Sequence, residues 1–309
     1  MKTAARDEHS LASQATAPAS QRSHPILGSR PVAPRRIAII RPPEFSLNMI
    51  YAGVATLLGY RDLLYTLTLF RISIRYKQSL LGPLWAILQP LALMTVYTLI
   101  FSRVAKVSSD GAPYPLFVFS GLLPWIFFSS AISNSINGLI HYPALLTKMY
   151  FPREIIPLSY VFAALVDFAI ACVLLGGLMA YYRVPLSWNA LYLLPIVAIL
   201  TAFTAAMALV LSSVQSRFRD VGVALPLLLQ VGMFAAPVVY SVNAVPVRYR
   251  RLFLLNPLAG LLDSFRRVLI HGLAPDMPML ITAGVITLCC LVAAYGYFKA
   301  AEGTMADTL

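Results

Sequence analysis

A basic segment runs directly into a long apolar one within residues 71–101, and this pattern constrains the fold of the chain most. Arg71, Arg75 and Lys77 lie in the basic segment, and the residues that follow are uncharged and strongly apolar as far as Phe101. Positive charge beside about 20 apolar residues marks the cytoplasmic end of a transmembrane helix. The pattern recurs along the chain, so the sequence predicts an all-α membrane protein with several transmembrane spans.

The composition supports a membrane protein and argues against nucleic-acid binding. The chain is 59% hydrophobic and 12% charged, whereas soluble domains carry about 25% charged residues. The net charge is +12, but the basic residues flank the apolar segments, which suits anionic lipid head groups and control of topology. The three cysteines lie inside apolar stretches, and no Cys/His pair has metal-site spacing, so we expect neither a metal site nor a disulfide.

Runs with few charges predict six transmembrane helices, which place both termini on one side of the membrane. Residues 1–77 carry eleven Lys and Arg residues, and two further basic loops, one with Lys148 and one with Arg217, fall on the same side. The positive-inside rule therefore predicts that both termini are cytoplasmic. The predicted spans cover approximately residues 80–102, 116–140, 155–182, 190–213, 222–241 and 279–299.

The region 243–278 does not fit this topology simply. It is external in the predicted topology, yet it contains five arginines. Its apolar pieces, within RLFLLNPLAGLLDSFRRVLI, are too short and too interrupted by proline to cross a bilayer. Either the topology is wrong there or the region forms a structured external or re-entrant element, and the short apolar pieces favour a re-entrant element.

Residues 60–78 are predicted to form an amphipathic helix at the membrane surface. One helical face is apolar and comprises Leu63, Leu67, Phe70 and Ile74. A different face is basic or polar and comprises Arg61, Thr68, Arg71 and Arg75. Such a helix lies along the cytoplasmic leaflet, with its apolar side in lipid and its arginines near phosphates or a protein partner. The alternative, a helix packed on a soluble domain, is disfavoured because the sequence contains no such domain.

The chain is therefore expected to divide into four regions. Residues 1–45 are rich in Ala, Ser, Pro and Arg and lack an apolar signal segment, so they are expected to form a disordered cytoplasmic tail. Residues 46–79 hold the interface helix, and residues 80–300 form the six-span transmembrane domain. Residues 301–309 form a cytoplasmic C-terminal tail.

Several segments, in order along the chain, are similar to the membrane subunit of type-2 ABC exporters. They are RYKQSLLGPLWAILQPL, PYPLFVFSGLLPWIFFSSAI, LLTKMYFPREIIPL and SRFRDVGVALPLLLQ, followed by APVVYS and LNPL. Together they cover about residues 60–300 and resemble the exporters of lipid-linked O-antigen, capsule or teichoic-acid chains. The resemblance implies an interface helix, six spans, a cytoplasmic coupling element between spans two and three, and re-entrant external helices before span six. It also implies a homodimer in the bacterial inner membrane.

The sequence has no nucleotide-binding motif of the P-loop type. No G-x-x-x-x-G-K-[ST] occurs, and no glycine is followed by lysine, so the chain cannot cradle ATP phosphates in that way. If transport is driven by ATP, a separate ATP-binding cassette subunit must bind ATP and magnesium. The chain itself is expected to be a transport subunit and not an enzyme, with no cofactor of its own.

Residues 141–155, HYPALLTKMYFPREI, are the predicted docking segment for that subunit. They form a short polar and aromatic break between two spans. A proline-bounded helix with an aromatic anchor and charges suits a protein interface, and the family resemblance favours docking over a plain connecting loop. The candidate coupling residues are Lys148, Tyr150, Phe151, Pro152, Arg153 and Glu154. The candidate basic residues of the interface helix are Arg61, Arg71, Arg75 and Lys77.

Aromatic residues crowd the external half of spans one and two. Sugar rings present apolar C–H faces that stack on aromatic planes, so an aromatic surface would let a repetitive glycan slide. Most of these aromatics are expected to belong to the interfacial belt, and the four candidates for a glycan path are Tyr97, Phe117, Trp125 and Phe128.

Asp167 is the only acidic residue placed well inside a predicted span. An intramembrane carboxylate is a candidate for a proton relay, but a relay needs several such groups. No His, Lys or Arg accompanies Asp167 in the interiors of the predicted spans. We therefore expect a hydrogen-bonded contact inside the protein or across a dimer.

The predicted function is the export of lipid-linked polysaccharide, driven by ATP. An exporter of small drugs or lipids with the same fold is the alternative. An ion-coupled secondary transporter would need paired repeats of spans and more intramembrane charges, and a membrane enzyme would need clustered Asp, Glu and His residues; neither pattern is found. The predicted partners are an ATP-binding cassette subunit, a second copy of the chain, membrane lipids and the lipid-linked polysaccharide, with no nucleic acid.

Overall fold

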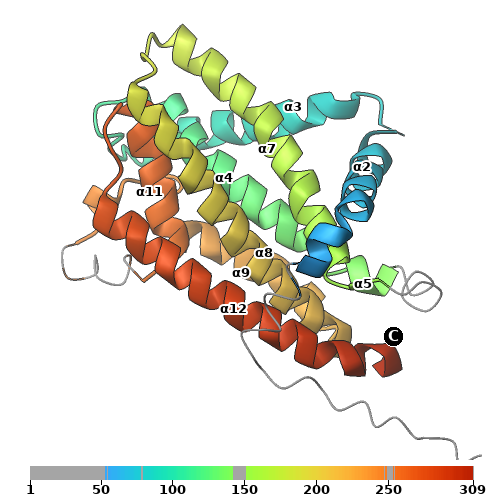
Figure 1. Cartoon of the computed structure of the whole chain (residues 1–309). Coiled ribbons are helices and arrows are strands. Elements are labelled where there is room, and N and C mark those ends of the chain that lie inside the picture. The colour runs from blue at the N-terminus through green and yellow to red at the C-terminus, as the bar shows by residue number, and fades with distance from the viewer. Residues whose placement is uncertain are drawn as a thin grey trace, which may run out of the picture. The chain divides into compact units, whose positions relative to one another are not determined.

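The computed structural model describes residues 53, 55–77, 79–141, 151–246, 248, 253 and 255–308, all within the compact unit of residues 42–309. Figure 1 shows these residues as a bundle of helices, and no strand occurs among them. The predicted all-α fold is confirmed for this part of the chain. The predicted tail of residues 1–45 lies outside the described residues.

Five segments of the described chain are helical, long and apolar enough to cross a membrane. The first consists of η1 (Gly82–Leu84), α3 (Trp85–Tyr97) and the π-helical η2 (Thr98–Val104). The others are α4 (Tyr114–Ser135), α7 (Ile155–Tyr181), η3 (Trp188–Tyr192) continuing as α8 (Leu193–Arg217), and α12 (Met277–Thr308). All five coincide with predicted spans within a few residues, and α12 continues into the predicted C-terminal tail.

The remaining predicted span is shorter in the structure than in the prediction. Helix α9 (Val221–Ala235) has 15 residues, a length of about 22 Å, whereas the hydrocarbon core of a bilayer is about 30 Å thick. The helix stops because Pro237 follows: Ala236 has an extended backbone, with φ −95° and ψ 139°, as residues before proline prefer. The predicted helical range 222–241 is therefore too long.

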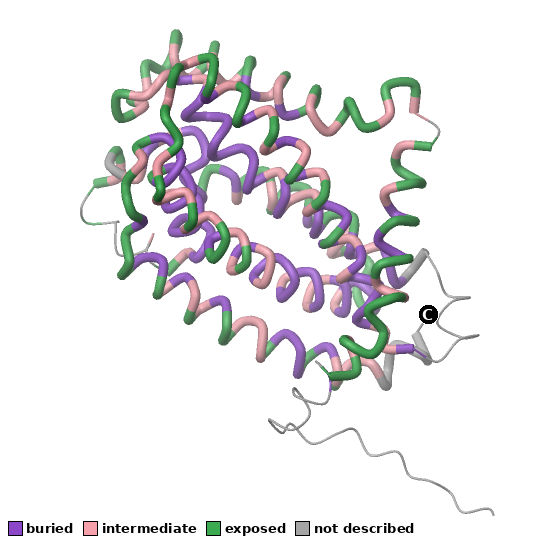
Figure 2. The backbone as a smooth tube through the Cα atoms, turned by 45° about the horizontal axis from the view of Figure 1, so that its top comes forward, coloured by how far each residue is buried: buried purple, intermediate pink, exposed green. Residues whose placement is uncertain are grey.

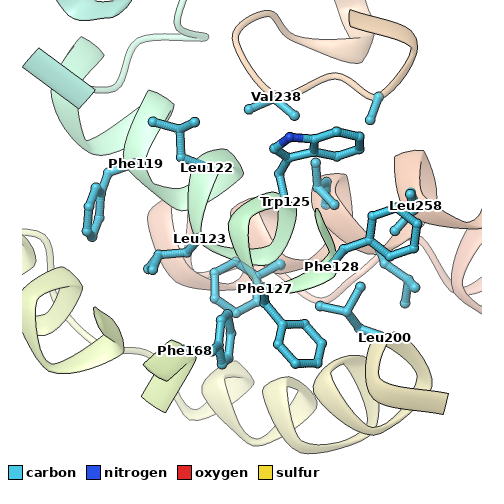
Figure 3. Packing of buried hydrophobic residues seen from close by; sticks show 14 of the residues in the cluster. Phe119, Leu122, Leu123, Trp125, Phe127, Phe128, Phe168, Leu200, Val238 and Leu258 are labelled. Atoms are coloured by element: carbon cyan, nitrogen blue, oxygen red, sulfur yellow. The ribbon is translucent and has the colours of Figure 1, made fainter. Parts of the chain in front are cut away.

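Helix α4 is the central helix of the bundle. It packs against α3, α7, α8, α9 and α11 (Pro257–Ile270), and most of its residues are buried (Figure 2). The ring centre of Phe127 lies 5.6 Å from that of Phe168 on α7, and Phe128 stacks on Phe203 of α8 at 5.8 Å. Figure 3 shows Phe127, Phe128 and Phe168 among aliphatic side chains. Burial of large aromatic rings dominates the energetics of such a core, so α4 fixes the positions of its neighbours.

The two ends of the bundle are built from different elements. The α5 end gathers α5 (Gly138–His141), the start of α7, α2 (Arg61–Lys77) and the late turns of α8 and α12. One apolar cluster joins them there, consisting of Leu67, Leu139, Phe151, Ile155, Ile156, Leu209 and Phe298. The opposite, α11 end contains α11, η3 and the residues that follow α9 as far as η4 (Val242–Ala244).

Helix α11 begins and ends with residues that suit helix boundaries. The side-chain oxygen of Asn256 accepts a hydrogen bond from the N–H of Leu258 at 3.1 Å, and Pro257 occupies the first helical position. After the helix, Gly272 has φ +61°, the left-handed conformation that commonly ends helices. The Asn189 side chain of η3 donates a hydrogen bond to the Gly272 carbonyl at 2.6 Å, which ties the end of α11 to η3.

Arg266 of α11 is buried, with 3% of its surface exposed, although it is positively charged. Its guanidinium donates hydrogen bonds to the carbonyl oxygens of Pro237 (3.1 Å), Val238 (2.8 Å) and Tyr240 (3.3 Å) in the chain after α9. It also lies 3.8 Å from the centre of the Phe117 ring of α4. Buried carbonyl groups need donors once the helix has ended, and Arg266 supplies them. The basic character of the region 243–278 therefore has, in part, a structural role.

Replacing Arg266 by methionine is expected to destabilise the protein strongly. The variant keeps an apolar chain of similar length but removes hydrogen bonds to buried carbonyl groups, each of which costs about 1–3 kcal/mol when left unsatisfied. A thermal unfolding measurement on the purified protein in detergent should show a lower melting temperature. The control is Arg267→Met, at an exposed position on the same helix. Equal effects of the two substitutions would contradict the role assigned to Arg266.

Candidate functional site

Two arginines of α2 face the protein. Arg71 has 6% of its surface exposed, and its guanidinium lies 4.3 Å from the centre of the Tyr160 ring of α7. Arg75, one turn later, forms an ion pair with Asp167 of α7. These contacts place one side of α2 against α7 and join the predicted interface helix to the bundle.

The outward side of α2 is different. Phe70 and Ile74 are 46% and 53% exposed, although the sequence places them on the apolar face. The Arg61 side chain is 80% exposed, and Lys77 is also at the surface. Exposed apolar side chains flanked by cations suit a helix in the head-group region of a leaflet. The location of α2 at the membrane interface stays a prediction, and this surface supports it.

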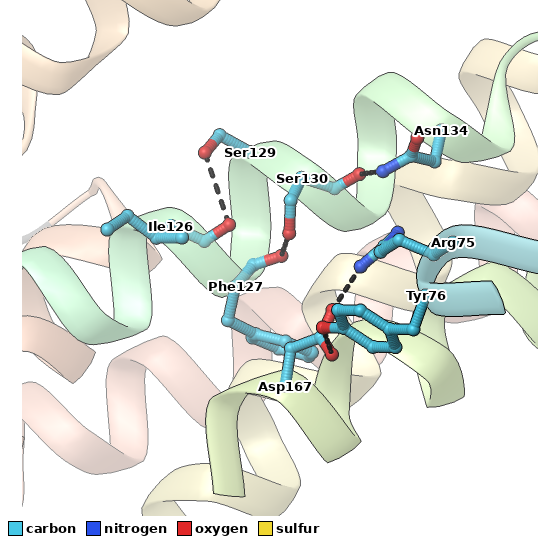
Figure 4. Close-up of polar contacts among 8 residues, drawn as sticks. All are labelled: Arg75, Tyr76, Ile126, Phe127, Ser129, Ser130, Asn134 and Asp167. Carbon is cyan, nitrogen blue, oxygen red and sulfur yellow. Dashed lines mark hydrogen bonds and ion pairs between the residues drawn. The ribbon is translucent and has the colours of Figure 1, made fainter. Parts of the chain in front are cut away.

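Asp167 lies inside α7 and is held by consecutive residues of α2, as Figure 4 shows. Arg75 balances its charge, and the Tyr76 hydroxyl donates a hydrogen bond to the second carboxylate oxygen at 2.6 Å. Burial and this hydrogen bond to Asp167 raise the pKa of Tyr76 to about 12, so the phenol remains a proton donor at neutral pH. The expected hydrogen-bonded contact inside the protein is confirmed.

Two neighbouring cavities lie along α4. The first has a volume of about 270 Å³ and adjoins Asp167, between α2, α3, α4 and α7. The second has a volume of about 240 Å³ and lies between α3, α4 and α9. Both are lined by Gln89, Ile126 and Ser130, and Ser129 and Ser133 add hydroxyl groups to the second. The shared lining makes one surface that mixes amide, hydroxyl and apolar groups.

The structure separates the four aromatic candidates for a glycan path into two pairs. Tyr97 and Trp125 line the second cavity together with Met233 of α9, and the Tyr97 hydroxyl lies 3.6 Å from the Met233 sulfur. Phe117 is fully buried beneath Arg266, and Phe128 is 7% exposed against Phe203. Phe117 and Phe128 therefore belong to the packed core, and Tyr97 and Trp125 line the second cavity. Trp125 is also a core residue, because it is 6% exposed and its ring centre lies 5.7 Å from that of Phe128.

Of the predicted docking segment 141–155, the structure describes His141, the last residue of α5, and the residues from Phe151 onward. Lys148 and Tyr150 lie outside the described residues. Phe151 is 8% exposed within the apolar cluster of the α5 end, and Pro152 and Arg153 are half-buried. In the single chain, the Phe151 side chain therefore anchors the docking segment to the interior of the protein. Its direct contact with another subunit stays a prediction, which the burial of this side chain does not support.

Glu154 and Arg153 connect the segment to α12. The Glu154 carboxylate is fully buried; it accepts hydrogen bonds from Lys299 Nζ at 2.8 Å and from the Tyr295 hydroxyl at 3.4 Å. The Arg153 guanidinium donates a hydrogen bond to the carbonyl oxygen of Glu302 at 2.8 Å. Both residues therefore form their contacts within the same chain, with α12.

Sequence reasoning did not identify the partners of these candidate residues. Lys299 and Glu302 lie at the end of the last span, where a lysine is ordinarily explained by the positive-inside rule. Gln89 and Ser130 are polar residues in otherwise apolar spans, and that pattern is the signal that could have pointed to the cavities.

Residues 62–270 match a protein family described as "ABC-2 type transporter". The chain is 31% identical over 259 residues to the O-antigen export system permease protein RfbA of Myxococcus xanthus, covering 83% of this chain and 98% of that protein. It is 33% identical over 219 residues to a protein of the same name from Klebsiella pneumoniae, covering 70% of this chain and 83% of the relative. Identity to the polysialic acid transport protein KpsM of Escherichia coli is 24% over 246 residues, covering 77% and 93% of the two chains.

A double-mutant cycle on Arg75 and Asp167 should reveal direct coupling between α2 and α7. Arg75→Met and Asp167→Asn, singly and combined, should give an interaction energy in the unfolding free energy of about 0.5–3 kcal/mol, as for residues in contact. The measurement is reversible unfolding of the purified protein in detergent micelles.

The matched control for this cycle is the pair Arg61→Met and Asp62→Asn. Those two side chains are 80% and 99% exposed and 3.9 Å apart, so solvent screening should leave no measurable coupling. Additive effects of the Arg75 and Asp167 substitutions would show that the ion pair does not hold α2 against α7.

Proposed function

We propose that this chain, which belongs to the ABC-2 type transporter family, is the membrane-spanning subunit of an ATP-driven exporter of lipid-linked polysaccharide. The observation that carries the proposal is the similarity to an O-antigen export permease over 98% of that protein's length. Similarity to a polysialic acid transport protein extends the same substrate class to a second polymer. The five long apolar helices supply the membrane-spanning body that such a subunit needs.

The proposed topology has six crossings with the α5 end in the cytoplasm of a bacterial inner membrane. Helix α9 and the chain after Ala235 make the fifth crossing. Where the backbone is not helical at membrane depth, its carbonyl groups must accept hydrogen bonds from other parts of the protein. Arg266 donates such hydrogen bonds to the carbonyl oxygens of Pro237 and Val238. Helix α11 has 14 residues, about 21 Å, which is too short to cross. It therefore enters and leaves the membrane from the external side.

The docking of an ATP-binding cassette subunit is assigned to the α5 end, at residues 141–155. The ATP and magnesium belong to that partner, because this sequence has no P-loop of its own. Pro152 and Arg153 reach the surface there, next to Lys148 and Tyr150 in the sequence. Phe151 and Glu154 support this surface from inside, through the apolar cluster of the α5 end and through α12.

The glycan path is assigned to the two cavities along α4 and to a second copy of the chain that completes it. Gln89, Ser129 and Ser130 offer hydrogen-bonding groups, and Tyr97 and Trp125 offer aromatic planes. The second cavity opens between α3 and α9, and α9 carries exposed Leu227, Val231 and other apolar side chains. Because exposed apolar faces of membrane helices contact either lipid or another subunit, α9 suits a homodimer contact beside the path.

Proton coupling is disfavoured as a second function. The carboxylate of Asp167 is engaged by Arg75 and Tyr76. A proton relay needs several titratable groups along a path, whereas these two contacts make Asp167 a structural link between α7 and α2. ATP hydrolysis by the partner subunit is therefore the proposed energy source for transport.

Deleting the gene for this chain tests the substrate class. Lipid-linked polysaccharide should accumulate inside the cells, and surface polysaccharide should disappear, because synthesis continues while export stops. Fractionation of the glycolipid and restoration by the wild-type gene are the measurement and its control. Unchanged surface polysaccharide together with greater sensitivity to small toxic compounds would instead indicate the drug-exporter alternative.

Substitutions of the four aromatic candidates should separate path residues from core residues. Tyr97→Leu should lower export at a normal protein level, because the flat ring is lost while apolar bulk remains. Trp125→Leu should lower both export and the melting temperature, because its ring lines the cavity and is also packed in the core. Phe117→Leu and Phe128→Leu should instead lower the melting temperature, since both rings are packed in the core. The control is Trp188→Leu, at a position that is 93% exposed. Normal export in the Tyr97 and Trp125 variants would exclude the proposed path.

A further inference from the structure

The contacts of the docking segment converge on one stretch of α12. Glu154 binds Lys299 and Tyr295, and Arg153 binds the carbonyl of Glu302. The three positions on α12 are four and three residues apart, so they lie along two turns of one helical face. The segment proposed to receive the ATPase is thus attached to the last helix, 145 residues away in sequence, by directional bonds.

A buried ion pair is an unusual way to attach two elements. Removing a carboxylate and an ammonium from water costs free energy that their attraction only partly offsets, and apolar residues of similar volume are often as stable. The Glu154 carboxylate is 1% exposed and the Lys299 side chain 18%. Lys299 is also held by Glu302 at 3.0 Å. Charged hydrogen bonds fix distance and direction, whereas an apolar contact can slide, so this pair suits the transfer of a displacement.

Helix α12 extends from this contact to the opposite end of the bundle. It has 32 residues, a length of about 48 Å. It packs along α8 and against α11. The contact with α11 is close: a β-carbon added to Gly260 of α11 would lie only 3.2 Å from Cγ of Met279 of α12. A rigid helix bound at both ends connects the docking segment to the α11 end.

We infer that Glu154 and Lys299 are positioning residues that transmit the movement of the docked ATPase subunit to α12. This inference rests on the proposed docking function of residues 141–155. It assigns to the last helix a part in coupling that no motif in its sequence indicates. The ATPase thereby displaces two helices together, α7 through its N-terminal end and α12 through the ion pair.

The decisive variant removes both charges at once. Glu154→Gln with Lys299→Met removes both members of the buried pair, and the carboxylate that loses Lys299, that of Glu302, is 26% exposed and reaches water, so the protein should fold and bind the ATPase subunit. Export per ATP hydrolysed should fall several-fold in reconstituted vesicles, whereas Lys299→Arg should retain most of the wild-type ratio. The matched control is Arg219→Met, which removes an exposed cation from the other basic loop of the α5 end. A wild-type ratio in the double variant would overturn the inference.

A measurement on the wild-type complex keeps the inference testable if the double variant does not fold. Hydrogen–deuterium exchange should change in residues 295–302 when the ATPase subunit binds and again when ATP is added. No change in that stretch would overturn the inference. Cross-linking from a Lys148→Cys variant reports on docking separately: absence of a cross-link to the ATPase would reject the docking segment itself, whatever the exchange shows.

Discussion

The apolar interior of a membrane protein offers no water to a charged group, so a buried charge must find its partners within the protein. Three contacts of charged side chains, two of them buried and one partly exposed, organise the described helices. Arg266 joins α11 to the chain after α9, Asp167 with Arg75 joins α7 to α2, and Glu154 with Lys299 joins the docking segment to α12. Each contact joins elements that are far apart in the sequence or that follow one another without a continuous helix. The proposed docking surface depends on the contact between Glu154 and Lys299, and the first cavity of the proposed glycan path is bordered by Asp167 and Arg75.

The transmembrane helices could be predicted well because hydropathy is a local property. An uncharged apolar run between charged flanks identifies a span without reference to any other part of the chain. The same reasoning overestimated α9, since the apolar run continues past Ala235 while Pro237 ends the helix. It also could not detect the π-helical turn at Thr98–Val104. Apolar content alone does not determine the hydrogen-bonding pattern of the backbone.

The candidate site could be located from sequence, but the direction of its side chains could not. Residues around Glu154 were identified as a coupling element, yet Lys299, 145 residues later, decides that this carboxylate points inward. The partner of Asp167 is Arg75, 92 residues earlier. Likewise, Trp125 and Phe128 look equivalent in sequence and are both buried, but the helices packed around α4 make Trp125 part of the wall of the second cavity as well. Such long-range pairings need the folded structure.

Transport in a purified system tests the central claim most directly. The chain and its ATP-binding cassette subunit, reconstituted together into vesicles, should move a lipid-linked polysaccharide across the membrane. The measured quantity is the fraction of glycan protected from an added glycosidase. The account predicts that protection rises only when both subunits and ATP with magnesium are present. Protection that appears with this chain alone, under a proton gradient and without ATP, would contradict it.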